Sequence, residues 1–349
     1  MSSKVKKKVL AAAGITALIL VAAILALGVF ELVVNGMKNS VDFAKAGKRW
    51  SADGSPYAVI AAYAEDGCGV DSDMILQWEH SMDQALTEAS ISSDGGRAWT
   101  WAASFDTQLS PVGNKGSTLA EVTVCMGDFF VFHNFNYLYG SGFLNDPTNP
   151  MGVVLDEDLA WKLFGAQNIV GMTFMINDEE YTVTGVVRAT SKNGAYGYTY
   201  GTRPRMYMSY AGFSKLSTGQ FTCYETAIPN PVKSFAKNIF DTVVSLNQDR
   251  SDVVEVTDRF SIENRFGNMK KLKYSWISIN KLEYPYWENE AKVYDYRCAT
   301  LMIWEIIIVS IAVASLLTSI VLVVVSGYSI AVSAKNIFGK VSAKIRKKK

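Results

Sequence analysis

Two long uncharged apolar stretches, one near each end of the chain, constrain its fold more than any other feature. The first runs from Val9 to Phe30 and the second from Ile306 to Ala334. As helices they would extend roughly 33 and 43 Å, which exceeds the hydrocarbon thickness of a bilayer, about 30 Å. A helix in a soluble core has no use for so long an unbroken apolar sequence. We therefore expect both stretches to cross a membrane.

Basic residues flank both apolar stretches and predict their orientation. Four lysines lie among the first eight residues, and seven Lys or Arg lie among residues 335–349. Short basic flanks stay on the cytoplasmic side of a membrane. We therefore expect a cell-membrane protein with two spans, both termini in the cytoplasm and the central region outside it. A cleaved secretory signal is the alternative for the first stretch, but such signals have shorter apolar runs, about 7 to 15 residues.

With a net charge of only +1 over 349 residues, the chain has no strong overall electrostatic field to attract a highly charged partner. We expect no nucleic-acid binding for this reason. The basic residues gather instead at the two ends of the chain, where membrane lipid headgroups are the expected contact.

Four cysteines, Cys68, Cys125, Cys223 and Cys298, lie outside the apolar stretches, on the side where disulfides can form. The sequence leaves open whether they are bridged or are small buried residues. No CxxC pair occurs and the chain has only two histidines, so we expect neither a metal site nor a cofactor.

The central region alternates segments with strand and helix patterns. Tyr57–Tyr63 has strand length, and Asp71–Ala89 has apolar residues at helical spacing. A second strand–helix pair follows at Tyr224–Ile228 and Val232–Leu246, and Val253–Ile262 and Lys273–Ile279 are predicted strands.

Between these two pairs lies a different pattern, consisting of a strand at Gly152–Leu155, a helix at Asp156–Phe164 and a hairpin over residues 172–187. We therefore expect an α+β extracytoplasmic domain, in which a discontinuous strand–helix subdomain is interrupted by a second, inserted α+β subdomain. Two transmembrane helices flank it. The expected divisions are tails at 1–8 and 335–349, spans at 9–34 and 301–334, and the domain at 35–300 with its insertion at about 126–215.

The segment from Val153 to Val187 carries a set of framework positions in a characteristic order. They comprise a strand, a helix that ends at a glycine, a second glycine step and a hairpin strand: Val153, Val154, Leu155, Leu159, Ala160, Leu163, Phe164, Gly165, Val170, Gly171, Tyr181, Val183, Gly185 and Val186. This segment resembles the MacB-like periplasmic core domain of ABC transporter permeases of the MacB/FtsX class. Segments at 124–143 and 206–208 extend the resemblance.

The resemblance implies a function without bond chemistry, in which such domains pass the motion of the spans to the exported side. By resemblance, the partners would be an ABC ATPase subunit and a multi-span permease. Members of the family usually have four spans, and some carry a fused ATPase. This chain has two apolar stretches, and its Gly113–Thr118 loop lacks the spacing of a phosphate-binding loop.

We therefore expect a truncated or divergent member that acts as a non-catalytic membrane subunit of an export or envelope-remodelling assembly. The alternative is a stand-alone membrane-anchored binding or scaffold protein.

Catalytic residues are not predicted. His80 lies on a predicted helix and His133 lies among Phe132, Phe135 and Tyr137, where a lone histidine is ordinarily a packed core residue. Small residues at spacing four in both spans would permit homo- or hetero-oligomers through the membrane helices.

One loop is the expected site of partner contact. Tyrosines spaced by two, with arginines nearby, are typical of interface residues: Tyr196, Tyr198, Tyr200, Arg203 and Arg205. The alternative is that these rings cover an edge of the domain itself.

Overall fold

The computed structural model describes residues 3–51, 54–91, 96–143, 150–189, 200–278 and 284–346. The chain forms two compact units. One consists of residues 1–38 together with 297–349, and the other of residues 39–296. Each is described by itself below.

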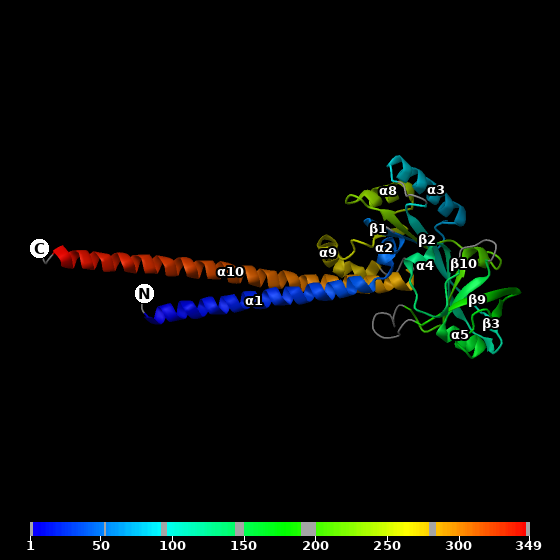
Figure 1. The fold of residues 1–349 in the computed structure, drawn as a ribbon, viewed down its shortest axis with the longest axis horizontal. Helices are drawn as coiled ribbons and strands as arrows, with labels where there is room; N and C mark the ends of the chain where they lie inside the picture. Colours follow the sequence, from blue (N-terminus) through cyan, green and yellow to red (C-terminus); the bar gives the residue numbers. More distant parts are fainter. Residues whose placement is uncertain are drawn as a thin grey trace. The chain divides into compact units, whose positions relative to one another are not determined.

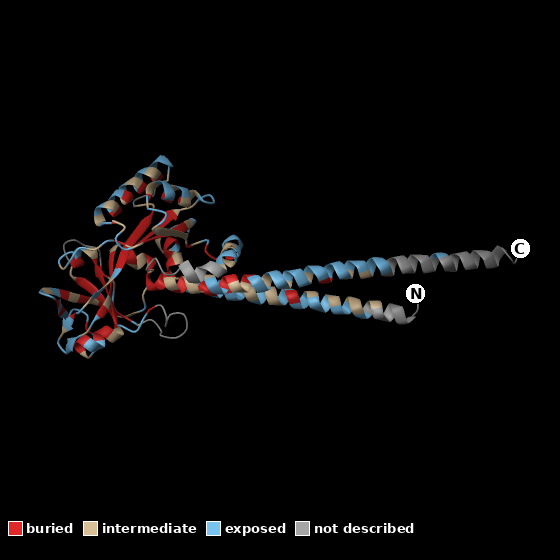
Figure 2. Cartoon of the chain, turned by 180° about the vertical axis from the view of Figure 1, so that it is seen from behind, coloured by how far each residue is buried: buried red, intermediate tan, exposed pale blue. Residues whose placement is uncertain are grey.

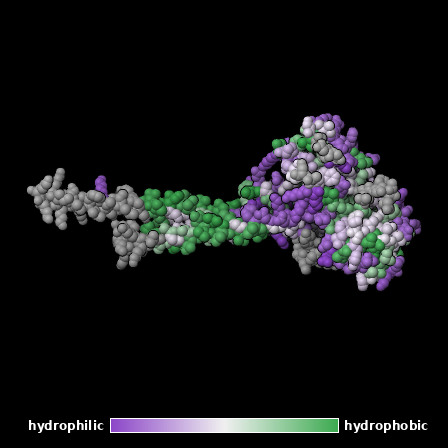
Figure 3. All heavy atoms as spheres, in the orientation of Figure 1, coloured by the Kyte–Doolittle hydropathy of each residue, from purple (hydrophilic) through white to green (hydrophobic). Residues whose placement is uncertain are grey.

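The first unit is a pair of long helices. It contains most of α1 (Ser3–Ser40) and the larger part of α10 (Tyr286–Arg346). Apolar side chains cover both helices (Figure 3). Among the described residues, Ala11–Ser40 and Tyr286–Val325 are long and apolar enough to cross a membrane. These two helices agree with the two predicted membrane stretches.

Polar side chains join α1 to α10 within this unit. The Ser315 hydroxyl donates to the carbonyl of Thr16 at 2.8 Å, and the Ser319 hydroxyl lies 2.8 Å from Thr16 Oγ1. Ser315 and Ala23 are buried, whereas most of their apolar neighbours face outward. A small hydroxyl side chain at a helix contact allows close approach and supplies a hydrogen bond, which is a common way for helices to associate in lipid.

The second unit is built on one mixed sheet. In the part of the chain that the structure describes, the strand order is β12-β1-β11-β2-β5-β10-β7-β9-β8-β3-β4, with β6 pairing with β9. The strands, which are largely buried (Figure 2), are β1 (Tyr57–Ala64), β2 (Thr100–Leu109), β3 (Val112–Gly113), β4 (Gly116–Ser117), β5 (Ala120–Gly127), β6 (Tyr137–Gly140), β7 (Gly152–Asp156), β8 (Thr173–Ile176), β9 (Glu179–Val187), β10 (Arg205–Ser209), β11 (Cys223–Pro229) and β12 (Ser251–Glu255).

Helices cover the two ends of this sheet separately. α3 (Ser72–Glu88) and α8 (Phe235–Val243) pack together beside β1 and β2, whereas α5 (Glu157–Phe164) lies at the other end with β7 and β9 (Figure 1). This arrangement confirms the expected α+β domain with a discontinuous first part and an inserted second part. The two parts share one sheet, because β5 pairs antiparallel with β2 and parallel with β10.

The inserted helix begins and ends as its sequence predicts. Asp156 precedes α5 and its carboxylate accepts a hydrogen bond from the backbone N–H of Leu159 at 2.7 Å. Gly165 ends the helix with φ at 71°, in the left-handed region that favours glycine. Leu159, Leu163 and Phe164, on the inner face of this helix, are buried.

Three local predictions are wrong. Val253–Ile262, predicted as a strand, is a strand only as far as Glu255, where β12 ends. Lys273–Ile279, predicted as a strand, lies mostly in α9 (Ile262–Ser278). A helix that has already started gains one hydrogen bond for each added residue, whereas a strand needs a partner strand. The spacing of apolar residues over Glu31–Trp50 predicts a single helix that continues from the first span, but α1 ends at Ser40 and the chain resumes as a short 3₁₀ turn, η1 (Phe43–Lys45), and α2 (Ala46–Trp50).

Candidate functional site

A layer of polar side chains covers one face of the sheet, opposite the apolar face that packs against α3 and α8. Because side chains alternate along a strand, neighbouring strands place these residues on the same face. The register pairs Tyr63 with Cys223, Cys223 with Ser104, and Ser104 with Cys125. This polar layer includes Tyr63, Ser104, Asp106, Thr123, Cys125, Arg205, Tyr207, Cys223 and Glu225.

The beginning of α10 packs on this polar layer. The Tyr207 and Tyr286 hydroxyls lie 3.1 Å apart, and the Tyr63 hydroxyl donates to Glu288 Oε2 at 2.9 Å. Residues 286–296 thus belong to the domain, although the same helix continues into the other unit.

A buried ion-pair cluster fixes the first turns of α10. Both terminal nitrogens of Arg259 donate to the two oxygens of Glu288, one of them at 2.8 Å. Arg259 Nε donates to Asp295 at 2.8 and 3.0 Å. Arg259 and Glu288 are 4% and 0% exposed. Burial works to lower the pKa of Arg259, but Glu288 and Asp295 raise it well above its ordinary value.

A second, partly exposed contact lies beside this cluster. The Tyr284 hydroxyl donates to Asp252 at 2.9 Å, and Lys292 Nζ lies 3.2 Å from the same carboxylate. Lys292 also lies over the ring of Tyr284, 4.0 Å from its centroid. The edge strand β12 is therefore tied to the beginning of α10.

The segment that follows α1 has its own anchor in the domain. Arg49 pairs with Asp42 at 3.1 Å, and it also donates to the carbonyls of Val131 and Phe132 at 2.6 and 2.5 Å. The backbone N–H of Asn134 donates to Asp42 at 3.1 Å. Both chain segments that adjoin the long helices are therefore held by an arginine–carboxylate pair.

The loop residues predicted to contact a partner fall into three groups. Tyr196 and Tyr198 lie outside the described residues. Arg203 is exposed and forms an ion pair with Glu121 at 2.8 Å. Tyr200 and Arg205 are buried, with exposed fractions of 3% and 4%. The structure brings Tyr200 and Arg205 together but places both in the interior of the domain.

Arg205 belongs to the polar layer. Its guanidinium lies 3.3 Å from Asp106 and 3.2 Å from Thr123. The guanidinium carbon is 4.7 Å from the ring centroid of Tyr286 and 5.2 Å from that of Tyr200. Burial works to lower the pKa of Arg205, but Asp106 and the neighbouring phenols raise it above its ordinary value. The guanidinium is therefore a fixed positive charge in the layer.

Asp156 connects the same loop to the inserted subdomain. Its second carboxylate oxygen accepts from the backbone N–H of Arg205 at 2.8 Å and from the Tyr200 hydroxyl at 3.2 Å. Burial raises the pKa of Asp156 to about 6, although these hydrogen bonds work in the opposite direction.

His133 is a packed core residue, as predicted, with its ring 4.3 Å from that of Trp287 and 4.4 Å from that of Phe129. Its Nε2 lies 2.8 Å from Glu225 Oε2, a partner that the sequence did not reveal. Within the described part of the chain, no group of three His, Cys, Asp or Glu residues could hold a metal ion. None of the four cysteines, all of which lie among the described residues, forms a disulfide.

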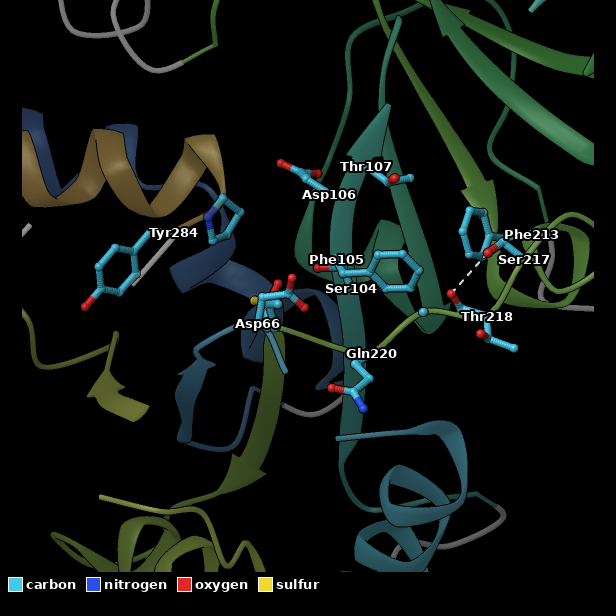
Figure 4. Close-up of a pocket in the computed structure, with 14 residues that line it drawn as sticks. Asp66, Ser104, Phe105, Asp106, Thr107, Phe213, Ser217, Thr218, Gln220 and Tyr284 are labelled. Carbon is cyan, nitrogen blue, oxygen red and sulfur yellow. Dashed lines mark hydrogen bonds between the residues drawn. The ribbon is translucent and has the colours of Figure 1, made fainter. Parts of the chain in front are cut away.

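A cavity of about 340 Å³ opens beside the polar layer (Figure 4). Ser104 and Asp106 line it from β2, Thr218 and Gln220 from the segment before β11, and Tyr284 from the segment before α10. Its lining residues include carboxylates, hydroxyls and an amide, but no histidine, lysine or arginine. The carboxylates of this cavity can accept hydrogen bonds, and its hydroxyls and amide can both donate and accept them.

No local sequence pattern predicts the Arg259 cluster. Arg259 and Glu288 lie 29 residues apart and Tyr63 lies 225 residues before Glu288, so no local pattern connects them. The only available signal was two acidic residues, Glu288 and Glu290, in an aromatic segment just before an apolar helix. Acidic side chains in such a position need partners when they are buried.

Comparison with known proteins places the chain in a family. A family model described as MacB-like periplasmic core domain matches residues 13–261. No curated protein matches.

Several solved structures are similar. One is the periplasmic region of MacB from Actinobacillus actinomycetemcomitans, at 17% identity and a TM-score of 0.41, covering 59% of this chain and 92% of that one. Another is the extracellular domain of the noncanonic ABC-type transporter YknZ from Gram-positive bacteria, at 12% identity and a TM-score of 0.36, covering 56% and 99%.

Proposed function

Because the chain belongs to the MacB-like periplasmic core domain family, we propose that it is a non-catalytic membrane subunit of an ABC-type export or envelope-remodelling assembly. The family model matches residues 13–261, which include most of the first apolar helix and most of the domain. In this role the domain binds partners and relays motion, and the ATPase and a multi-span permease are supplied by other chains.

The proposed topology places both termini in the cytoplasm and the domain outside it. The basic flanks of the two apolar helices support this orientation. A domain outside the cytoplasm would also suit the family to which the chain belongs.

The main support for the relay function is the way in which the domain holds the first turns of α10. This helix is continuous from Tyr286 to Arg346, and its first turns are held in the domain by Arg259, Glu288 and Asp295. A helix is stiff over this length, because every interior residue adds a backbone hydrogen bond. A displacement of the first turns of α10 would therefore be passed to Arg259, in the turn after β12, and to Tyr63 on β1.

The proposed partner contact is the segment around Arg203. Its exposed guanidinium, together with Tyr196 and Tyr198, has the composition of an interface. Tyr200 and Arg205 support the segment from inside the domain. The substitution Arg203→Glu should reduce recovery of the partner by about tenfold, whereas Lys233→Glu, at another exposed ion pair, should not.

Pull-down from mild detergent tests the assembly. The tagged full-length chain should recover an ATPase subunit and a multi-span permease from its own cells, and the ATPase should be lost when the permease is absent. Recovery of the chain alone, or only with exported proteins, would instead favour a stand-alone anchored binding or scaffold protein.

A further inference from the structure

A row of exposed side chains runs along the first half of α9 (Figure 1). Ile262 and Phe266 are 65% and 39% exposed and lie four residues apart, so they lie on the same side of the helix. Lys270 continues the row at the same spacing, with its Nζ 4.5 Å from the ring centroid of Phe266. The row therefore combines an aliphatic side chain, an aromatic ring and a cation on one exposed helix face.

The charge on α9 is mainly positive. The helix contains four basic residues and one acidic residue. Of the basic residues, Lys270 and Lys271 are exposed. The acidic residue, Glu263, already forms an ion pair with Lys233 at 3.2 Å. The exposed surface beside Phe266 is therefore complementary to an anionic partner.

The beginning of α9 is held close to α10. Arg259, just before α9, donates to Asp295 on α10 at 2.8 and 3.0 Å. The side-chain amide of Asn264 donates to the carbonyl of Asp258 at 2.8 Å, which ties the first turn of α9 to the same segment. The second predicted span begins at Leu301, and along a continuous helix this residue lies only about 9 Å beyond Asp295. α9 therefore begins near the point where α10 enters the membrane.

We infer that the row formed by Ile262, Phe266 and Lys270 lies on the surface of the membrane that the two apolar helices cross, and that it binds anionic phospholipids there. The two apolar side chains enter the boundary between headgroups and acyl chains, and Lys270 and Lys271 contact the phosphate groups. Basic helices with aliphatic and aromatic side chains on one face commonly bind membrane surfaces in this way. A lysine can also lay its apolar stem along such a surface while its ammonium group stays among the headgroups. This inference requires the two spans but does not depend on the proposed assembly.

Spin-label depth measurements on the full-length chain in nanodiscs, with one chain in each disc, test the inference. In a Cys68→Ser background, Ile262→Cys carries the label, and the bilayer is phosphatidylcholine with or without phosphatidylglycerol. With phosphatidylglycerol the label should lie about 5 to 10 Å within the headgroup region, where oxygen reaches it better than a water-soluble nickel chelate does. It should lie closer to the water in phosphatidylcholine alone, because the anionic lipid is missing. A label at Leu76→Cys, an exposed apolar site on α3, should remain in water in both bilayers.

Matched charge reversals separate lipid binding by α9 from a general effect of charge. The double variant Lys270→Glu, Lys271→Glu should move the label at position 262 into water in the bilayer that contains phosphatidylglycerol, because like charges then face each other. The double variant Lys115→Glu, Lys162→Glu reverses two exposed charges in the inserted subdomain and should leave the label at its original depth.

Three results would overturn the inference. It is wrong if the nickel chelate reaches the label at position 262 as easily as the label at position 76, or if the two double variants give the same depth. It is also wrong if the label is shielded only in discs that hold two chains, because the row would then be a contact between copies of the chain. Each substitution replaces an exposed side chain on a helix or loop, so all variants should unfold at the temperature of the Cys68→Ser parent.

Discussion

At the scale of the residue, Asp156 is the most informative side chain of the inserted subdomain. Its two carboxylate oxygens accept three hydrogen bonds, from Leu159, Arg205 and Tyr200, so one group fixes the start of α5, a strand and a loop. The first of these roles follows from sequence, because aspartate before a helix is a common cap. The other two depend on strand neighbours that the sequence does not specify.

We predict a pH-dependent stability that depends on Asp156. Its pKa in the folded state, about 6, lies above the ordinary value of 3.8. The folded protein therefore binds the proton more tightly than the unfolded chain, and this contribution is complete below about pH 4 and is lost as the pH rises through 6. It amounts to at most about 3 kcal/mol. The midpoint temperature of thermal unfolding should therefore decrease as the pH is raised from 5 to 7.

The variant Asp156→Asn should remove this part of the pH dependence and also destabilise the fold, by about 1 to 3 kcal/mol, because an amide NH₂ would face a backbone N–H donor. Asp178→Asn, in the exposed hairpin turn, should keep the pH dependence of the parent. An unchanged pH profile in Asp156→Asn would contradict the assignment.

At the scale of the element, the contact between Arg259 and the first turns of α10 determines how firmly this helix is held. The variant Arg259→Met should cost roughly 3 to 5 kcal/mol, because it leaves Glu288 and Asp295 buried without a cation. Hydrogen exchange should accelerate first in residues 286–296. The exposed pair is the control, since Arg203→Gln should change stability by less than about 1 kcal/mol.

The double variant Arg259→Met, Glu288→Leu should recover part of this loss, because the buried carboxylate is removed together with its partner. If the double variant is as unstable as the sum of the two single variants, the pair does not act as a unit.

The two membrane helices offer a separate prediction. Ser315 is buried against α1 and donates to the carbonyl of Thr16, so Ser315→Leu should push the helices apart. Spin-label distances between α1 and α10 should lengthen by several ångströms, on the order of one side chain. Val313→Leu, on an outward face, should leave these distances unchanged. Equal distances in both variants would mean that Ser315 does not set the contact.

The elements differ in how far sequence could predict them. The apolar helices and α5 were predictable, because continuous hydrophobicity, the Asp156 cap and the Gly165 stop are local signals. α9 was not, because a short alternating stretch at its end resembles a strand until the preceding helix is considered. The polar layer was not predictable either, because its partners come from strands that are distant in sequence. The interior position of Tyr200 and Arg205 likewise depends on tertiary packing.

At the scale of the whole molecule, topology is the prediction on which the proposed function depends. In a Cys68→Ser background, a membrane-impermeant thiol reagent added to intact cells should label Asp178→Cys and should not label Ser3→Cys. The three remaining native cysteines are buried and give little background. Labelling of Ser3→Cys before lysis, or of Asp178→Cys only after lysis, would reverse the orientation and remove the basis for an extracytoplasmic domain.

The two chemically different faces of the shared sheet have a consequence for how the chain finds its native pairing. If any of its central strands paired with its neighbour one residue out of register, every side chain of that strand would move to the opposite face of the sheet. Asp106, Arg205 or Glu225 would then be forced against hydrocarbon, while Trp101 or Met206 would meet carboxylates. Each mispaired alternative therefore carries a large penalty, so the charged side chains help to select one alignment of the strands over its competitors.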